Sequence, residues 1–177
     1  LVGTLVEDVE NDLAEVLFWR QPNRLVRGEQ LYDEARQRDP SYSVAKLFWW
    51  FNMYADVNWS VTPRPSYPAD GRKVMDSYSQ PADLKDRLQE RLGVFPLFKF
   101  WGPAADITST RWIADATVAV MQKHNPSLTL AYLPHLDYNL QRLGPDDLRI
   151  AEDIRAVDAE AGKIIDSARV RGADVVV

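Results

Sequence analysis

Apolar and polar positions alternate along the chain with two periods, and each period predicts a different kind of element. Apolar residues at steps of three and four predict helices over residues 27–40, 80–93, 108–126 and 144–172. Short runs of apolar, aromatic and β-branched residues predict strands over residues 42–51, 94–101, 127–133 and 173–177. Three prolines and a glycine predict a proline-rich loop over residues 60–73.

The order of these elements predicts an α/β fold. Helices and strands alternate at the spacing of βαβ units, in which right-handed crossovers join parallel strands. The nearly continuous apolar character of 127–133 is typical of a strand that is covered on both faces. We therefore predict one α/β domain over residues 1–177, with a mainly parallel sheet flanked by helices. Because 173–177 reads as the start of a buried strand, we expect the chain to be an internal portion of a larger domain.

Composition narrows the class of protein and the kinds of partner. A hydrophobic content of 46% and a charged content of 27% are typical of a soluble globular protein. A net charge of −5 argues against nucleic acid or an anionic membrane as a partner, and no apolar run approaches the roughly 20 residues that span a bilayer. The acidic start and the absence of cysteine favour the cytoplasm and exclude disulfides and thiolate chemistry. Any metal must therefore be held by carboxylate, imidazole, hydroxyl or amide groups.

Candidate chemistry gathers just after the strand predicted over 127–133. Ligands of open α/β sheets bind beyond the carboxyl ends of the strands, which is where Asp137 falls. Asp137 either begins a turn or pairs with an arginine, or it acts as a metal ligand or acid–base group. In an extended segment His135 points to the same side as Asp137. His135 is then either a group that binds substrate or supports Asp137, or a hydrogen-bonded loop residue. His124, the other histidine, ends a predicted helix, and we expect it to cap that helix.

Residues 132–145, "YLPHLDYNLQRLGP", resemble the alkaline phosphatase superfamily, in particular its type I phosphodiesterase/nucleotide pyrophosphatase branch. In that branch a strand is followed by an Asp, by a His four residues later, and by Gly-Pro at seven and eight. Asp137, Gly144 and Pro145 match this pattern, whereas Gln141 occupies the His position. "AKLFWWFNMY", "RWIADATVAVMQKHNPSLTLAYL" and "AVDAEAGKIIDSARVRGADVVV" resemble other helices and strands of the branch, so the likeness covers residues 28–177.

The resemblance implies a metal-dependent hydrolase of phosphoric esters, acting on phosphodiester or nucleotide pyrophosphate bonds. It implies two divalent ions, usually zinc, a Thr or Ser nucleophile, and an alkaline-phosphatase-like three-layer sandwich of which this chain is part. Asp137 would be a ligand of one ion. An amide oxygen is a poorer zinc ligand than imidazole. At Gln141, therefore, either another divalent ion is bound, the site is weaker, or the amide contacts a metal-bound water.

The resemblance also sets limits. Thr4 lacks the surroundings of the family's nucleophile, and the family's Asp-His-Gly motif is not visible, so we expect this chain alone to be inactive. One alternative is a non-catalytic α/β scaffold that binds a ligand or partner without turnover. Another is a branch of the superfamily that acts on phosphomonoesters or phosphonates.

The expected partner is a small phosphoric ester or a nucleotide. The aromatic run that includes Trp50 and Tyr54 is either a buried strand or a stacking wall for a base, which the resemblance would permit. We also expect self-association, because a parallel sheet without its terminal strands leaves an open edge and exposed apolar surface.

Overall fold

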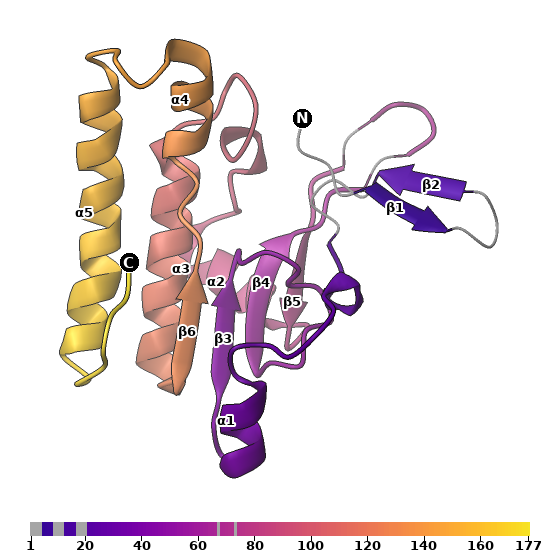
Figure 1. Ribbon diagram of the computed structural model, residues 1–177. Coiled ribbons are helices and arrows are strands. Elements are labelled where there is room, and N and C mark those ends of the chain that lie inside the picture. Colours follow the sequence, from indigo (N-terminus) through magenta and orange to yellow (C-terminus); the bar gives the residue numbers. More distant parts are fainter. Residues whose placement is uncertain (1–4, 9–12, 17–20, 67, 73) are drawn as a thin grey trace.

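The structure is a computed structural model that describes residues 5–8, 13–16, 21–66, 68–72 and 74–177 (Figure 1). Its helices are α1 (Asp33–Arg38), α2 (Leu84–Leu92), α3 (Ile107–His124), α4 (Leu136–Leu143) and α5 (Ile150–Arg169). Its strands are β1 (Leu5–Asp8), β2 (Leu13–Val16), β3 (Val44–Leu47), β4 (Trp59–Pro63), β5 (Ser77–Gln80) and β6 (Leu128–Ala131). Two short 3-10 helices cover Asn23–Leu25 and Leu97–Lys99.

A four-stranded sheet forms the centre of the molecule. Its strand order is β5-β4-β3-β6. β3 runs parallel to both β4 and β6, whereas β5 runs antiparallel to β4. β1 and β2 pair with each other as a separate antiparallel hairpin. The sheet is therefore mixed but mainly parallel, and helices flank it, which confirms the predicted α/β class.

The core lies on both faces of β3, whose residues are all buried. Ala45 and Leu47 belong to a large apolar cluster that also contains residues of α2 and α3. Val44 points to the other face, where it packs with Tyr32. This two-sided burial is why the strand reads as an uninterrupted apolar segment apart from Lys46.

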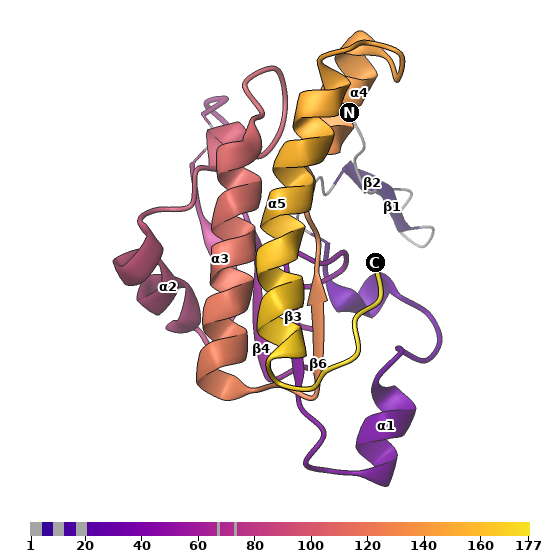
Figure 2. The ribbon, with the colours of Figure 1, turned by 90° about the vertical axis from the view of Figure 1, so that its left-hand side faces the viewer.

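α3 and α5 lie side by side along one face of the sheet (Figures 1 and 2). The Asp106 carboxylate caps α3 by accepting a hydrogen bond from the Thr108 backbone N–H at 2.9 Å. Between the helices, Arg111 Nε lies 3.1 Å from the buried Glu160 Oε1. Lys163 Nζ lies 3.1 Å from Asp115 Oδ1. Ion pairs as well as apolar contacts therefore hold α3 against α5.

Several predicted boundaries are wrong for local reasons. The strand expected over 42–51 stops at Leu47, because Phe48 and Phe51 have left-handed backbones with φ of 57° and 51°. The strand expected over 94–101 is a 3-10 turn, in which Lys99 N–H donates to the Pro96 carbonyl at 2.8 Å. The loop expected over 60–73 contains most of β4, which its prolines concealed from the sequence pattern.

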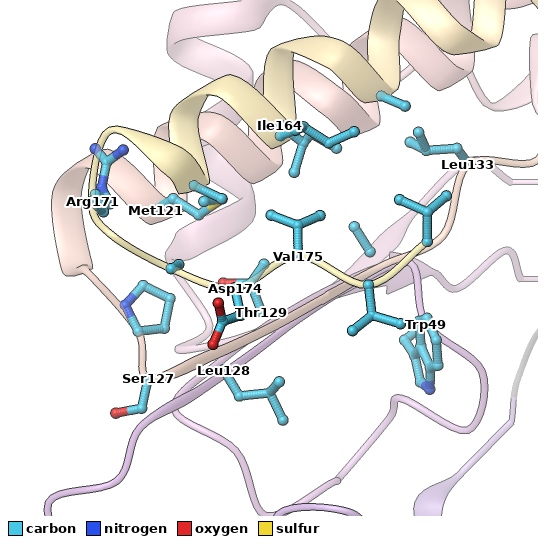
Figure 3. Close-up of a pocket in the computed structure, with 18 of the residues that line it drawn as sticks. Trp49, Met121, Ser127, Leu128, Thr129, Leu133, Ile164, Arg171, Asp174 and Val175 are labelled. Atoms are coloured by element: carbon cyan, nitrogen blue, oxygen red, sulfur yellow. The ribbon is translucent and has the colours of Figure 1, made fainter.

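Residues 173–177 do not form the predicted strand. The segment passes between α5 and β6 and helps to line a cavity of about 820 Å³ (Figure 3). Val175 and Ile164 point toward each other across this space (Figure 3). Val176 and Val177 are fully exposed. Among the helices in the described ranges, none combines the length and apolar character needed to cross a bilayer.

Candidate functional site

Asp137 lies in the first turn of α4, a helix that the sequence analysis did not predict. The Asp137 N–H donates to the Pro134 carbonyl at 3.0 Å as the chain turns from β6 into the helix. Gly144, with φ of 79°, ends the helix, and its N–H donates to the Leu140 carbonyl at 2.9 Å. The Gly-Pro pair of the sequence motif is thus the stop signal of α4. The leucines at 136, 140 and 143 were the helical signal available in the sequence.

The Asp137 carboxylate is open to solvent near the carboxyl end of β6. Gln141, one helical turn later and also exposed, donates from Nε2 to Asp137 Oδ1 at 2.7 Å. No arginine or lysine of the described residues forms an ion pair with Asp137. The arginine-pair alternative for Asp137 is therefore not what the structure contains, and one carboxylate oxygen is engaged by an amide.

Tyr132 connects Asp137 to the aromatic run. Burial, together with the nearby charges of Asp137 and Tyr138, raises the pKa of Tyr132 to about 12. The Tyr132 ring also packs against Trp50, with ring centroids 5.8 Å apart. Tyr132 therefore stays protonated at neutral pH and places an aromatic pair beside the acidic end of α4.

Tyr54 lies elsewhere. It is largely exposed, and its ring packs edge-on against Tyr78 of β5 at 5.3 Å. Because β5 and β6 are at opposite edges of the sheet, the structure separates Tyr54 from Trp50. Only Trp50 of the two candidate aromatic residues lies on the side of Asp137.

His135 does not point to the same side as Asp137, because the segment is helical rather than extended. His135 is the N-terminal flanking residue of α4, with φ of −55° and ψ of −34°. Its side chain is only 6% exposed, and Nε2 lies 3.0 Å from Asp153 Oδ1 at the start of α5. His135 is thus a contact between two helices, made through a side chain that is largely buried.

His124 does not act as a charged helix cap. Its ring stacks on Trp59 with centroids 4.6 Å apart, and burial together with Lys123 and Arg87 lowers the pKa of the imidazole. Asn125, in a left-handed conformation with φ of 45°, ends α3 in its place. His124 is therefore a packed, preferentially neutral ring at the end of α3, before β6, whereas α4 follows β6.

The residues that the structure describes supply part of a metal site. Asp137 and Gln141 offer one carboxylate and one amide, whereas zinc in proteins takes three or four ligands. Within the described ranges, no group of three or more His, Asp and Glu residues is arranged to hold a metal ion. Asp137 and Gln141 therefore do not complete a zinc site within the described residues. Thr4 lies outside the described residues.

Comparison with known protein families matches residues 5–177 to type I phosphodiesterase / nucleotide pyrophosphatase. The chain belongs to this family. The match confirms the resemblance seen at residues 132–145 and extends it upstream of residue 28. No curated protein and no solved structure matches the chain. Members of the type I phosphodiesterase family are hydrolases, so the chain is related to enzymes that cleave phosphoric esters.

Proposed function

We propose that this chain is part of the catalytic domain of a hydrolase. The enzyme cleaves phosphodiester or nucleotide pyrophosphate bonds with the help of divalent cations. The observation that carries the proposal is the family match over residues 5–177. Support comes from the geometry of the motif, because Asp137 is an exposed carboxylate just beyond the carboxyl end of a parallel strand. Ligands of α/β sheets bind at that edge.

In this proposal Asp137 is a ligand of one of two divalent ions. A bound cation would neutralise phosphoryl oxygens and lower the pKa of a nucleophilic hydroxyl or water. Gln141 donates from Nε2 to Oδ1 of Asp137, so Oδ2 would be the oxygen left to bind a cation. Carboxylate and amide oxygens suit hard ions such as Mg²⁺ or Mn²⁺ better than they suit zinc. Trp50 and Tyr132 form an apolar wall next to Asp137 on which an aromatic part of the substrate can pack.

The Asp137→Asn variant tests this assignment. Titration calorimetry with Zn²⁺ and with Mn²⁺ is expected to find at least tenfold weaker binding in the variant, because a neutral amide replaces a charged ligand. Asp146→Asn is the matched control, since Asp146 is an exposed carboxylate in the turn that follows α4. Equal cation affinity of Asp137→Asn and the unmodified chain would refute the ligand role. Hydrolysis of bis(4-nitrophenyl) phosphate is measured in parallel.

A non-catalytic binding scaffold is the second candidate, favoured by the incomplete donor set around Asp137 and Gln141. Calorimetry with a nucleoside monophosphate and an assay for the hydrolysis of bis(4-nitrophenyl) phosphate separate the two candidates. In a protein that contains this chain together with a nucleophile and the remaining metal ligands, the scaffold predicts saturable binding without product, whereas the hydrolase predicts cation-dependent cleavage of a diester. Preference for 4-nitrophenyl phosphate over the diester would instead favour a phosphomonoesterase.

A further inference from the structure

α4 is attached to the rest of the molecule mainly by polar contacts. None of its eight residues is fully buried, and its leucines are only half-buried. A helix of this length is not stable by itself in water. Its orientation must therefore come from specific contacts with its neighbours, and the strongest of these converge on α5.

Asp153, in the first turn of α5, accepts one hydrogen bond from the residue that precedes α4 and another from a residue within α4. His135 Nε2 lies 3.0 Å from one carboxylate oxygen, and Asn139 Nδ2 donates to the other at 2.6 Å. Because a carboxylate only accepts, the proton of the His135 contact belongs to Nε2 when the ring is neutral. The side chain of Asp153 is 16% exposed, so water competes little for these two bonds.

Arg142 adds a third polar contact on the side of α4 that carries His135 and Asn139. It donates to the Asn139 side-chain oxygen and, through Nη1, to the Pro103 carbonyl at 3.1 Å. Asn139 is thereby held from both ends, its amide nitrogen by Asp153 and its oxygen by Arg142. Residues 135, 139 and 142 follow helical steps of four and three, so one face of α4 carries all three contacts.

Asp137 lies on the opposite side of this helix. Successive residues of an α-helix are about 100° apart, so a side chain two positions away is rotated by roughly 200°. Asp137 comes two residues after His135, and Gln141 comes two residues after Asn139. The contacts with Asp153 therefore determine the direction in which the Asp137 carboxylate points.

We propose that Asp153 is a positioning residue, which fixes the rotation of α4 through His135 and Asn139 and so aims the Asp137 carboxylate at its cation. This inference rests on the proposed function for the role of Asp137. Asp153 itself touches neither cation nor substrate. Metal ligands of proteins depend on such supporting contacts, whose loss costs about 10- to 100-fold in metal affinity.

The anchoring can be measured without any cation by hydrogen exchange of the α4 amides. In Asp153→Ala the amides of residues 140 and 141 are expected to exchange at least tenfold faster, while those in the middle of α3 keep their rates. Glu152→Gln, which removes an exposed carboxylate one residue away, is the matched control and should leave both helices unchanged. Unaltered exchange of α4 in Asp153→Ala would overturn the proposal.

Cation affinity tests the consequence for Asp137. Asp153→Ala is expected to bind Mn²⁺ about tenfold more weakly than the unmodified chain at a temperature where circular dichroism finds both folded. The double variant Asp153→Asn with Asn139→Asp reverses the polarity of one hydrogen bond and keeps the net charge. In it the new amide donates to residue 139 and accepts from His135, so affinity should return to within about threefold of the original.

The outcomes separate this inference from the proposed function. If Asp137→Asn binds the cation normally, or the unmodified chain binds none, the ligand role fails and the positioning role fails with it. If Asp137→Asn weakens binding but Asp153→Ala binds like the unmodified chain, the ligand role stands and only the positioning role is refuted. A third outcome also contradicts the positioning role: Asp153→Ala binds Mn²⁺ more weakly, but the double variant Asp153→Asn with Asn139→Asp does not recover the affinity. The hydrogen bond between residues 153 and 139 would then not be what positions Asp137.

Discussion

At the scale of single residues, the buried amine of Lys46 is the least expected feature. Lys46 occupies β3 with only 1% of its surface exposed, and its Nζ lies 5.8 Å from the centre of the Tyr32 ring. Burial lowers the pKa of Lys46 to about 8, although Asp33 opposes the effect. No carboxylate of the described residues forms an ion pair with it. The charged form is therefore less favourable in the folded chain than in the unfolded one.

Lys46→Met is expected to raise the free energy of unfolding at pH 7 by roughly 3 kcal/mol, because it removes a buried charge and keeps the length of the side chain. Between pH 8 and about 10.5 the unfolded chain binds the lysine proton and the folded chain does not, so the stability of the unmodified protein rises over this window. The advantage of the variant should shrink accordingly. Urea unfolding at pH 7 and pH 10 measures the difference, and a constant gap between the two proteins would contradict it.

The placement of Asp137 beyond a strand end could be predicted from residues alone, but the contacts of His135 could not. An apolar run that stops at a polar segment is a local signal. The partner of His135 is Asp153, 18 residues later, and the pairing exists only because α4 and α5 pack together. His124 was misread for the same reason, since its stacking partner Trp59 comes from a distant strand.

At the scale of elements, long periodic segments were predictable and short ones were not. α3 and α5 carry enough apolar residues at helical spacing to be recognised, and β6 is a compact apolar run. β4 and β5 depend on pairing with each other, and their polar and proline residues carry little local signal. α4 was missed because it follows a strand after only a few residues.

The two glycines at the end of α4 and inside α5 should respond in opposite directions to alanine. Gly144 has φ of 79°, so Gly144→Ala is expected to destabilise the fold by about 1–2 kcal/mol although no atom obstructs a new methyl group. Gly162 lies within α5 and has open space around it, so Gly162→Ala should stabilise by about 0.5–1 kcal/mol. Thermal unfolding of both variants decides the matter; a shift of the same sign in both would be inconsistent with these backbone conformations.

At the scale of the whole molecule, β6 stands at one end of the sheet and its outer neighbour is the non-strand segment 173–177. An apolar cavity lies between this strand and α5, and two valines beside it are exposed. Such surfaces promote association between sheet edges.

We predict that the chain self-associates at high concentration through this edge. Val176→Asp together with Val177→Asp should reduce association at least severalfold, because two charges replace exposed apolar groups. Light scattering coupled to gel filtration over a range of concentrations provides the measurement. Val74→Asp is the control, since Val74 is exposed near β5 at the other side of the sheet. A monomer at every concentration would contradict the prediction.

The junction at Asp153 has an evolutionary consequence. Because one carboxylate serves a ring nitrogen and an amide at once, a substitution at any of the three positions leaves the other two with an unmet partner. In an alignment of homologous sequences, positions 135, 139 and 153 should therefore covary, whereas position 152 should vary independently of them.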